Sequence, residues 1–188
     1  MALLISHRGN IHGMNPGREN DPVYVQEAIH QGYYVMVNVW LVGESSVALG
    51  TLRPTYPVDI SFLRNRCIIC EAMTEETLNF LISQQVHCFM TGQDRTKLTS
   101  GGLIWYRSNQ KITPRTVMYM PEWYIPDIES LADFRCAGIC SDRVGRIRIA
   151  RRNVTNTVNT SENNNEDLNN LTIESDNQSV NDPSESNG

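Results

Sequence analysis

Short apolar runs alternate with amphipathic stretches over residues 2–149 of this sequence. Runs rich in Val, Ile, Leu and aromatic side chains, bounded by Gly, Asn or Ser, are typical of buried strands. By this criterion we predict strands over residues 3–6, 33–42, 47–49, 66–72, 86–90, 103–106, 116–120 and 136–140.

Helices are predicted between several of these strands. Asp21 and Pro22 indicate the start of a helix, because Pro is favoured in the first turn, and Gly32 ends it. Thr74 is a suitable N-cap for a second helix, and residues 128–134 predict a third.

Strands that alternate with helices imply crossover connections and a parallel sheet. Seven or eight strands suit a closed barrel better than an open sheet, so the expected fold class is α/β, a small, trimmed TIM-like (β/α) barrel. Eight-stranded barrels usually take roughly 250 residues, so several helices must be shortened to loops. Residues 93–102 are too few and too polar for an ordinary crossover helix.

The composition changes near residue 150. Residues 150–188 are rich in Asn, Ser, Thr and Glu and poor in large apolar side chains, which predicts a disordered tail behind a barrel of residues 1–149. An arginine cluster joins the two parts, and it can bind acidic lipid, phosphate or nucleic acid. We favour the simpler interpretation of a solvated domain edge that meets the acidic tail. The cluster consists of Arg143, Arg146, Arg148, Arg151 and Arg152.

The overall charge and the apolar runs limit the partners and the compartment. A formal net charge of −5 gives no electrostatic reason to expect nucleic acid. No apolar run approaches the ~20 residues that span a bilayer, so we expect a soluble, intracellular protein, cytoplasmic or virion-associated.

The five cysteines allow two interpretations, a zinc site or buried free thiols. Cys67 and Cys70 are three residues apart in a predicted strand, so their side chains point to opposite faces. We therefore favour buried thiols.

A His-Arg-Gly motif follows the first predicted strand and opens an ordered series of motifs. Together these motifs resemble the glycerophosphodiester phosphodiesterase family, a branch of the phosphatidylinositol-phospholipase-C-like barrels. The resemblance covers residues 2–143 and points to a short-chain, degenerate branch. Its motifs are Ser6-His7-Arg8-Gly9-Asn10, Glu19-Asn20, Asn38-Val39-Trp40-Leu41, Leu49-Gly50, Ile104-Trp105, Met120-Pro121-Glu122 and Gly138-Ile139-Cys140-Ser141-Asp142.

The resemblance implies roles for three residues. His7 matches the first catalytic histidine, Arg8 the phosphate-binding arginine and Glu19 a carboxylate at the barrel mouth. The family's reaction also needs a metal ion to neutralise phosphate charge and a second histidine to protonate the departing alkoxide.

Several positions that serve this chemistry in the family carry other residues here. The metal-binding Glu-x-Asp is replaced by Met36 and Asn38, and the His-Asp of the second histidine by Thr51 and Leu52. Methionine is too soft a ligand for magnesium or calcium, and threonine exchanges no proton near neutral pH.

The third and fourth predicted strands depart from the family in the same way. Glu71 keeps a carboxylate, but Met73 replaces the family's lysine, and Thr91 stands where the short branch tends to carry histidine. Several chemical roles are therefore lost while the strands that carry them remain.

Three functions are compatible with this pattern. The leading hypothesis is a non-catalytic barrel with a binding or structural role, in which a phosphate-containing small molecule or an acidic protein loop binds Arg8, Arg53 and aromatic side chains such as Trp105. No cofactor is expected for this function. Another hypothesis is an assembly component such as a virion protein, in which the tail acts as a tether.

The second hypothesis is a weak or altered hydrolase of glycerophosphodiesters or lipid headgroups. It would use His7, with Glu19 and Glu71 as metal ligands and Asn38 as a third ligand, and its cofactor would be Mg, Ca or Mn. His12 is the substitute for the missing second histidine that we consider for this enzyme.

Overall fold

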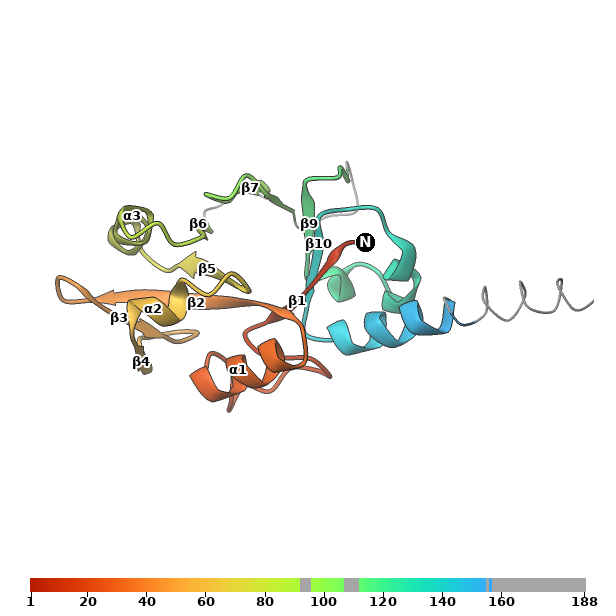
Figure 1. Cartoon of the computed structure of the whole chain (residues 1–188), viewed down its shortest axis with the longest axis horizontal. Helices are drawn as coiled ribbons and strands as arrows, with labels where there is room; N and C mark the ends of the chain where they lie inside the picture. The colour runs from red at the N-terminus through yellow and green to blue at the C-terminus, as the bar shows by residue number, and fades with distance from the viewer. Residues whose placement is uncertain (92–95, 107–111, 155, 157–188) are drawn as a thin grey trace, which may run out of the picture. The chain divides into compact units, whose positions relative to one another are not determined.

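A computed structural model describes residues 1–91, 96–106, 112–154 and 156 of the chain (Figure 1). The chain divides into two units, Met1–Ala150 and Arg151–Gly188. The described residues form a mixed α/β fold with one sheet of ten strands. Among these residues, none of the helices combines the length and the hydrophobicity needed to cross a bilayer.

Seven parallel strands form the body of the sheet. In their order across the sheet they are β6 (Cys88–Met90), β5 (Ile68–Ala72), β2 (Tyr34–Val42), β1 (Leu3–His7), β10 (Gly138–Ser141), β9 (Thr116–Tyr119) and β8 (Ile104–Tyr106). Three antiparallel strands extend this body. β3 (Ser46–Leu49) pairs with the end of β2, β4 (Tyr56–Val58) pairs with β3, and β7 (Thr96–Leu98) pairs with β8.

Helices connect the strands as the sequence predicts. α1 (Pro22–His30) packs against β2, and α3 (Glu75–Ser83) packs against β2, β5 and β6 (Figure 1). The side chain of Asp21 accepts a hydrogen bond from Val23 N–H at the start of α1, and Thr74 caps α3. Both predicted helix starts are confirmed.

The two faces of the sheet carry separate apolar clusters. The inner cluster takes one residue from each of the seven parallel strands, and the larger outer cluster lies between the sheet and the helices. The inner residues are Ile5, Met36, Ile69, Phe89, Trp105, Val117 and Cys140. Every parallel strand therefore contributes one side chain to a single apolar layer on this face of the sheet.

Strand pairing does not close the sheet, so the predicted TIM-like barrel is not shown. In the described part of the chain, β6 pairs with β5 alone. On its other side β6 meets the loop after β7, where Ser100 N–H donates to the Cys88 carbonyl at 2.8 Å and Cys88 N–H donates to Ser100 Oγ at 2.9 Å.

Some elements differ from those that the sequence predicts. The strands β4 and β7 and the short helix α2 (Ile60–Leu63) were not predicted, and residues 128–134 form a 3₁₀ helix, η2 (Ile128–Asp133), after a shorter one, η1 (Pro121–Trp123). A helix over residues 144–154 replaces the first part of the predicted disordered tail. The rest of that tail, beyond residue 156, lies outside the described residues.

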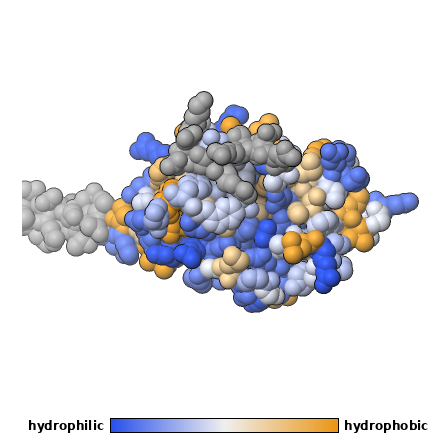
Figure 2. Space-filling model, turned by 180° about the vertical axis from the view of Figure 1, so that it is seen from behind, coloured by the Kyte–Doolittle hydropathy of each residue, from blue (hydrophilic) through white to orange (hydrophobic). Residues whose placement is uncertain are grey.

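The structure shows the surroundings of the cysteines and of two arginines of the cluster. None of the five cysteines forms a disulfide, and four are buried as predicted, while Cys67 is partly exposed. Arg148 donates to the carbonyl of Gly32, which follows α1, and lies over the ring of Tyr33, while Arg146 pairs with Glu129. Figure 2 shows a largely hydrophilic face with its apolar residues in separate small groups.

Candidate functional site

Polar side chains gather at the carboxyl ends of the parallel strands. Those that end a strand follow a residue of the inner apolar layer by two positions, so the alternation of the strand turns their side chains to the same face as that layer. His7, Asn38, Glu71 and Asp142 are buried there, with exposed fractions of 4%, 1%, 8% and 6%. The carboxyl end of a parallel sheet is the usual place for ligands and catalysis. Their hydrogen bonds define the polar cluster, which consists of His7, Arg8, Asn10, Glu19, Asn20, Asn38, Thr51, Glu71, Thr91, Tyr119 and Asp142.

His7 lies between Asp142 and Tyr119. Its Nδ1 is 2.8 Å from Asp142 Oδ1, and its Nε2 is 3.1 Å from the Tyr119 hydroxyl. Burial acts to raise the pKa of Asp142, but the hydrogen bond and charge of His7 outweigh it, and the pKa is lowered. An ionised carboxylate only accepts, so Nδ1 carries the hydrogen, and in the neutral ring Nε2 accepts from Tyr119.

Glu122 fixes the backbone of Asp142. Its Oε1 accepts from the Asp142 N–H at 2.9 Å and from the Ser141 hydroxyl at 2.8 Å. A carboxylate that accepts two hydrogen bonds holds the end of β10 in place. The dyad of His7 and Asp142 therefore has an orientation set by the fold.

Glu19 is bound by three protein donors. Arg8 Nη1 lies 3.0 Å from Glu19 Oε2, Thr51 donates to the same oxygen at 3.2 Å, and Asn10 donates to Oε1 at 3.0 Å. Arg8 also donates from Nε to Asn38 Oδ1 at 2.7 Å. Both oxygens of Glu19 are thus used within the protein.

Asn38 joins the two halves of the polar cluster. Its Oδ1 accepts from Arg8 and from Asn20, while its Nδ2 donates to Glu71 Oε2 at 2.8 Å and to the sulfur of Met73 at 3.3 Å. The Thr91 hydroxyl donates to the other oxygen of Glu71. The buried Asn38 amide therefore forms hydrogen bonds with residues on both sides of it, as is usual for a buried polar side chain.

These contacts occupy groups that a divalent cation would need as ligands. A metal between Glu19 and Glu71 needs a third oxygen ligand, but the Asn38 oxygen is taken by Arg8 and the amide N–H groups point at Glu71 and Met73. Met36 lies in the apolar layer. No group of three His, Cys, Asp or Glu side chains that could hold a metal occurs in the part of the chain that the structure describes.

Positive backbone φ values occur at two residues of the polar cluster, at Met120 beside it and, apart from it, at Gln85. Arg8, Asn20 and Met120 have φ values of 57°, 63° and 49°, a left-handed conformation that costs a non-glycine residue about 1–2 kcal/mol. Gly9, at φ 96°, also lacks space for a side chain, because a Cβ there would lie 2.6 Å from the ring of Tyr24. Strain of this kind is typical of functional sites.

Other predicted site residues lie apart from this network. Trp105 is 3% exposed and stacks on Phe89 with ring centroids 4.8 Å apart, so packing accounts for it. Arg53 is exposed, and so is Leu52, at 88%. His12 packs against Gly145, because a Cβ on that glycine would lie 2.8 Å from His12 Nδ1.

Sequence reasoning missed Asn10, Tyr119, Glu122 and Asp142 as site residues. The signal that could have found Tyr119 and Asp142 is their spacing, since each follows an inner apolar residue of its strand by two positions. Asn10 and Glu122 follow strands β1 and β9 in the loops at the same edge.

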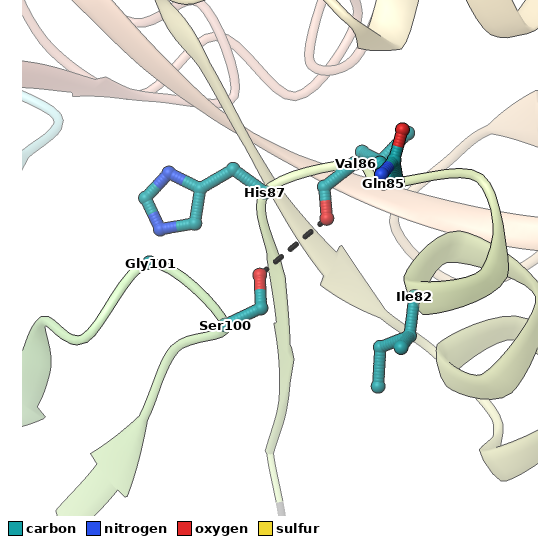
Figure 3. A pocket seen from close by; sticks show the side chains of 6 residues that line it. All are labelled: Ile82, Gln85, Val86, His87, Ser100 and Gly101. Atoms are coloured by element: carbon teal, nitrogen blue, oxygen red, sulfur yellow. Dashed lines mark hydrogen bonds between the residues drawn. The ribbon is translucent and has the colours of Figure 1, made fainter.

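A separate cavity of about 300 Å³ lies near the amino end of β6 (Figure 3). His87, Ser100 and Gly101 line it together with Ile82, Gln85 and Val86. Burial lowers the pKa of His87, whose Nε2 lies 3.0 Å from Thr99 Oγ1. Because the polar cluster is at the carboxyl ends of the strands, this cavity is not part of it.

Comparison with known proteins finds no family model, no curated protein and no solved structure that matches the chain. Membership of the glycerophosphodiester phosphodiesterase family therefore stays a prediction.

Proposed function

We propose that this protein is a degenerate phosphodiesterase-like barrel that binds a phosphate-containing small molecule without turning it over. One observation carries this proposal: protein donors already bind the carboxylates of the polar cluster. Glu19 receives three hydrogen bonds, and Glu71 and Asp142 each receive at least two. A carboxylate whose oxygens already accept hydrogen bonds from the protein is less available as a ligand for a metal ion.

The loss of the proton donor also argues against turnover. In the resemblance the second histidine corresponds to Thr51, which here donates to Glu19. Loss of one general acid or base typically costs about 10²–10⁴ in rate. Among the described residues, His7 is the one imidazole within the polar cluster.

Arg8 is the group that we assign to phosphate. Its guanidinium uses Nε for Asn38 and Nη1 for Glu19, and about 20% of the side chain is exposed. A guanidinium carries five N–H donors, and three of those of Arg8 have no partner among the residues that the structure describes. Bonds from Arg8 to Asn38 and Glu19 hold the group in one orientation, which lowers the entropy lost when a ligand binds.

A closed barrel is the architecture that we propose for this protein. Two observations support it: the inner layer draws on all seven parallel strands, and hydrogen bonds join Cys88 of β6 to Ser100. A ring of seven strands would pass from β6 through the loop at Ser100 to β8.

One observation favours the hydrolase as a second candidate. The pair of His7 and Asp142 has the arrangement of a general base, with an ionised carboxylate behind an imidazole. In that function Tyr119, which contacts Nε2, would move aside for the attacking hydroxyl.

Calorimetric titration with glycerol 3-phosphate tests the binding proposal. Wild-type protein should bind it, and Arg8→Gln should weaken binding about tenfold or more, since charged hydrogen bonds contribute about 1.5–3 kcal/mol. Glutamine keeps an N–H donor for Glu19, and thermal unfolding verifies that the variant is folded. Arg64→Gln removes an exposed arginine that binds Gln84 and is the matched control. Absent binding, or equal affinity in Arg8→Gln, contradicts the proposal.

A further inference from the structure

The cavity near the amino end of β6 has a described lining without a permanently charged side chain. Ile82 and Gln85 come from the end of α3 and the turn after it (Figure 3). Ser100 and Gly101 come from the loop after β7. Burial lowers the pKa of His87, the one titratable group among these described residues, so its ring is neutral at pH 7. A charged ligand would therefore lose hydration here without gaining an opposite charge from this lining.

The size and the apolar part of the cavity favour a ring. Its volume is about 300 Å³. A cavity of about 150 Å³ can hold a benzene ring, so this volume has room for a molecule of one or two rings. Ile82, which is 53% exposed, gives the cavity an apolar wall against which a flat ring can pack.

Val86 and Ser100 place an acceptor and a donor side by side in the cavity. Ser100 Oγ accepts from Cys88 N–H at 2.9 Å, and its own hydrogen is directed at the Val86 carbonyl. This second bond, drawn in Figure 3, is 3.4 Å long, beyond the usual range of about 2.5–3.0 Å for a hydroxyl donor. A ligand that accepts from Ser100 and donates to Val86 would replace one long bond by two ordinary ones.

Gln85 adopts a conformation that usually belongs to glycine. α3 ends in a Schellman motif, in which Gln85 N–H donates to the Ile82 carbonyl at 3.0 Å. Val86 N–H donates to the Leu81 carbonyl, also at 3.0 Å. The φ of Gln85 is 58°, and a side chain costs stability in this left-handed conformation. Strain of this kind in a cavity wall is typical of a functional site, and the Gln85 amide adds a further donor and acceptor.

His87 is a fixed part of the same wall. Its Nε2 lies 3.0 Å from Thr99 Oγ1, and Leu103 N–H donates to that same oxygen at 3.1 Å. The ring lies against Gly101, where a Cβ would be 2.6 Å from Nε2. A neutral imidazole held in this way reports on what enters the cavity.

We infer that this cavity binds a small, uncharged heterocycle with an amide edge, the chemistry that nucleobases present. The N–H of the amide edge donates to the Val86 carbonyl, its carbonyl accepts from Ser100, and the ring packs on Ile82. This inference goes beyond the proposed function, because the cavity is not part of the polar cluster that we assign to phosphate.

Proton NMR of the histidine ring signals tests the inference, with uracil, 1,3-dimethyluracil and glycerol as probes. Uracil should shift the His87 signal, which is identified by its loss in His87→Gln. The dimethyl compound keeps the ring and both carbonyls but has no N–H, so it should bind at least tenfold more weakly. Glycerol, an uncharged polyol, should leave the signal unchanged.

A variant that keeps the fold separates the role of Gln85 in binding from a role in stability. Gln85→Gly should leave Tm at or above that of the wild type, because glycine suits the positive φ, and should weaken uracil binding at least threefold. Gln84→Ala is the matched control and should bind uracil as the wild type does, since the Gln84 side chain binds Arg64.

The inference is overturned if uracil leaves the His87 signal unchanged or binds no more tightly than 1,3-dimethyluracil. Full uracil affinity in Gln85→Gly, or equal binding of glycerol, also contradicts it. None of these results depends on Arg8, so the proposed function of the polar cluster stands or fails separately.

Discussion

Asn38→Asp perturbs the centre of the polar cluster with almost no change of shape. Asn38 is 1% exposed, and its Nδ2 lies 2.8 Å from Glu71 Oε2. The substitution turns this hydrogen bond into a contact between two carboxylate oxygens, while Oδ1 keeps its bond to Arg8. The variant should therefore lose stability through one identifiable interaction.

The magnitude follows from the short distance. Two unit charges 4 Å apart repel by about 4 kcal/mol at an effective dielectric constant of about 20, and the nearby Arg8 offsets part of this. We expect a net loss of about 2–3 kcal/mol at pH 7. For a chain of this length each kcal/mol lowers Tm by about 2–4 °C, so Tm should fall by about 4–12 °C.

The loss should depend on pH. Repulsion raises the pKa of the coupled pair formed by Glu71 and the introduced carboxyl above the unfolded values near ~4. A carboxyl with a raised folded pKa stabilises the fold below its unfolded pKa, and this contribution is lost as pH rises through the folded pKa. The variant should thus approach the wild type near pH 4 and fall below it at neutral pH.

Thermal unfolding followed by circular dichroism between pH 4 and 8 measures this difference. The matched control is Asn65→Asp, because Asn65 accepts a hydrogen bond from Cys67 N–H through Oδ1, which a carboxylate retains. Millimolar calcium should raise the Tm of Asn38→Asp and not that of the wild type, since the new carboxylate supplies the missing ligand. Equal stability at pH 7, or a loss that is the same at every pH, refutes the reasoning.

Three further substitutions test separate parts of the structure. Gly9→Ala should cost about 2 kcal/mol or more, because the new methyl meets Tyr24 at a positive φ, and denaturant unfolding will measure it. As pH falls through the lowered pKa of Asp142, wild-type protein should lose stability that Asp142→Asn does not lose; matching acid-unfolding curves would contradict this. Thr74→Ala should cost about 1 kcal/mol by removing the cap of α3, and an unchanged denaturation midpoint would exclude that role.

The strands and the first two helices could be predicted because their signals are local. Asp21 and Thr74 cap helices where the sequence places them, and the apolar runs form strands. The strands β4 and β7 have three residues each and show no clear alternation, so no local pattern identifies them. Whether the sheet closes depends on contacts between distant strands, which the sequence pattern does not contain.

The candidate site was predictable in part. His7, Arg8, Glu19 and Asn38 were predicted, and the structure brings them into one network. The partners of His7 were missed, because Tyr119 and Asp142 are 112 and 135 positions away along the chain. Such partners become neighbours only through the order of the strands.

Trp105 shows the opposite error of sequence reasoning. An aromatic residue in a strand near a predicted site is compatible with ligand binding and with packing. The inward alternation of β8 places Trp105 on Phe89, with 3% of its surface exposed. By contrast, Trp123 follows the end of a strand, where the chain turns outward, and is 57% exposed.

The central claim is that the polar cluster binds its ligand without metal-dependent turnover. Phosphorus NMR of a glycerophosphodiester incubated with purified protein in magnesium, calcium, manganese or EDTA tests it most directly, with His7→Ala as the control. The account predicts that the diester signal shifts or broadens with protein while product forms no faster than in the His7→Ala sample. Metal-dependent product formation that His7→Ala abolishes would contradict the account and establish the polar cluster as an active site.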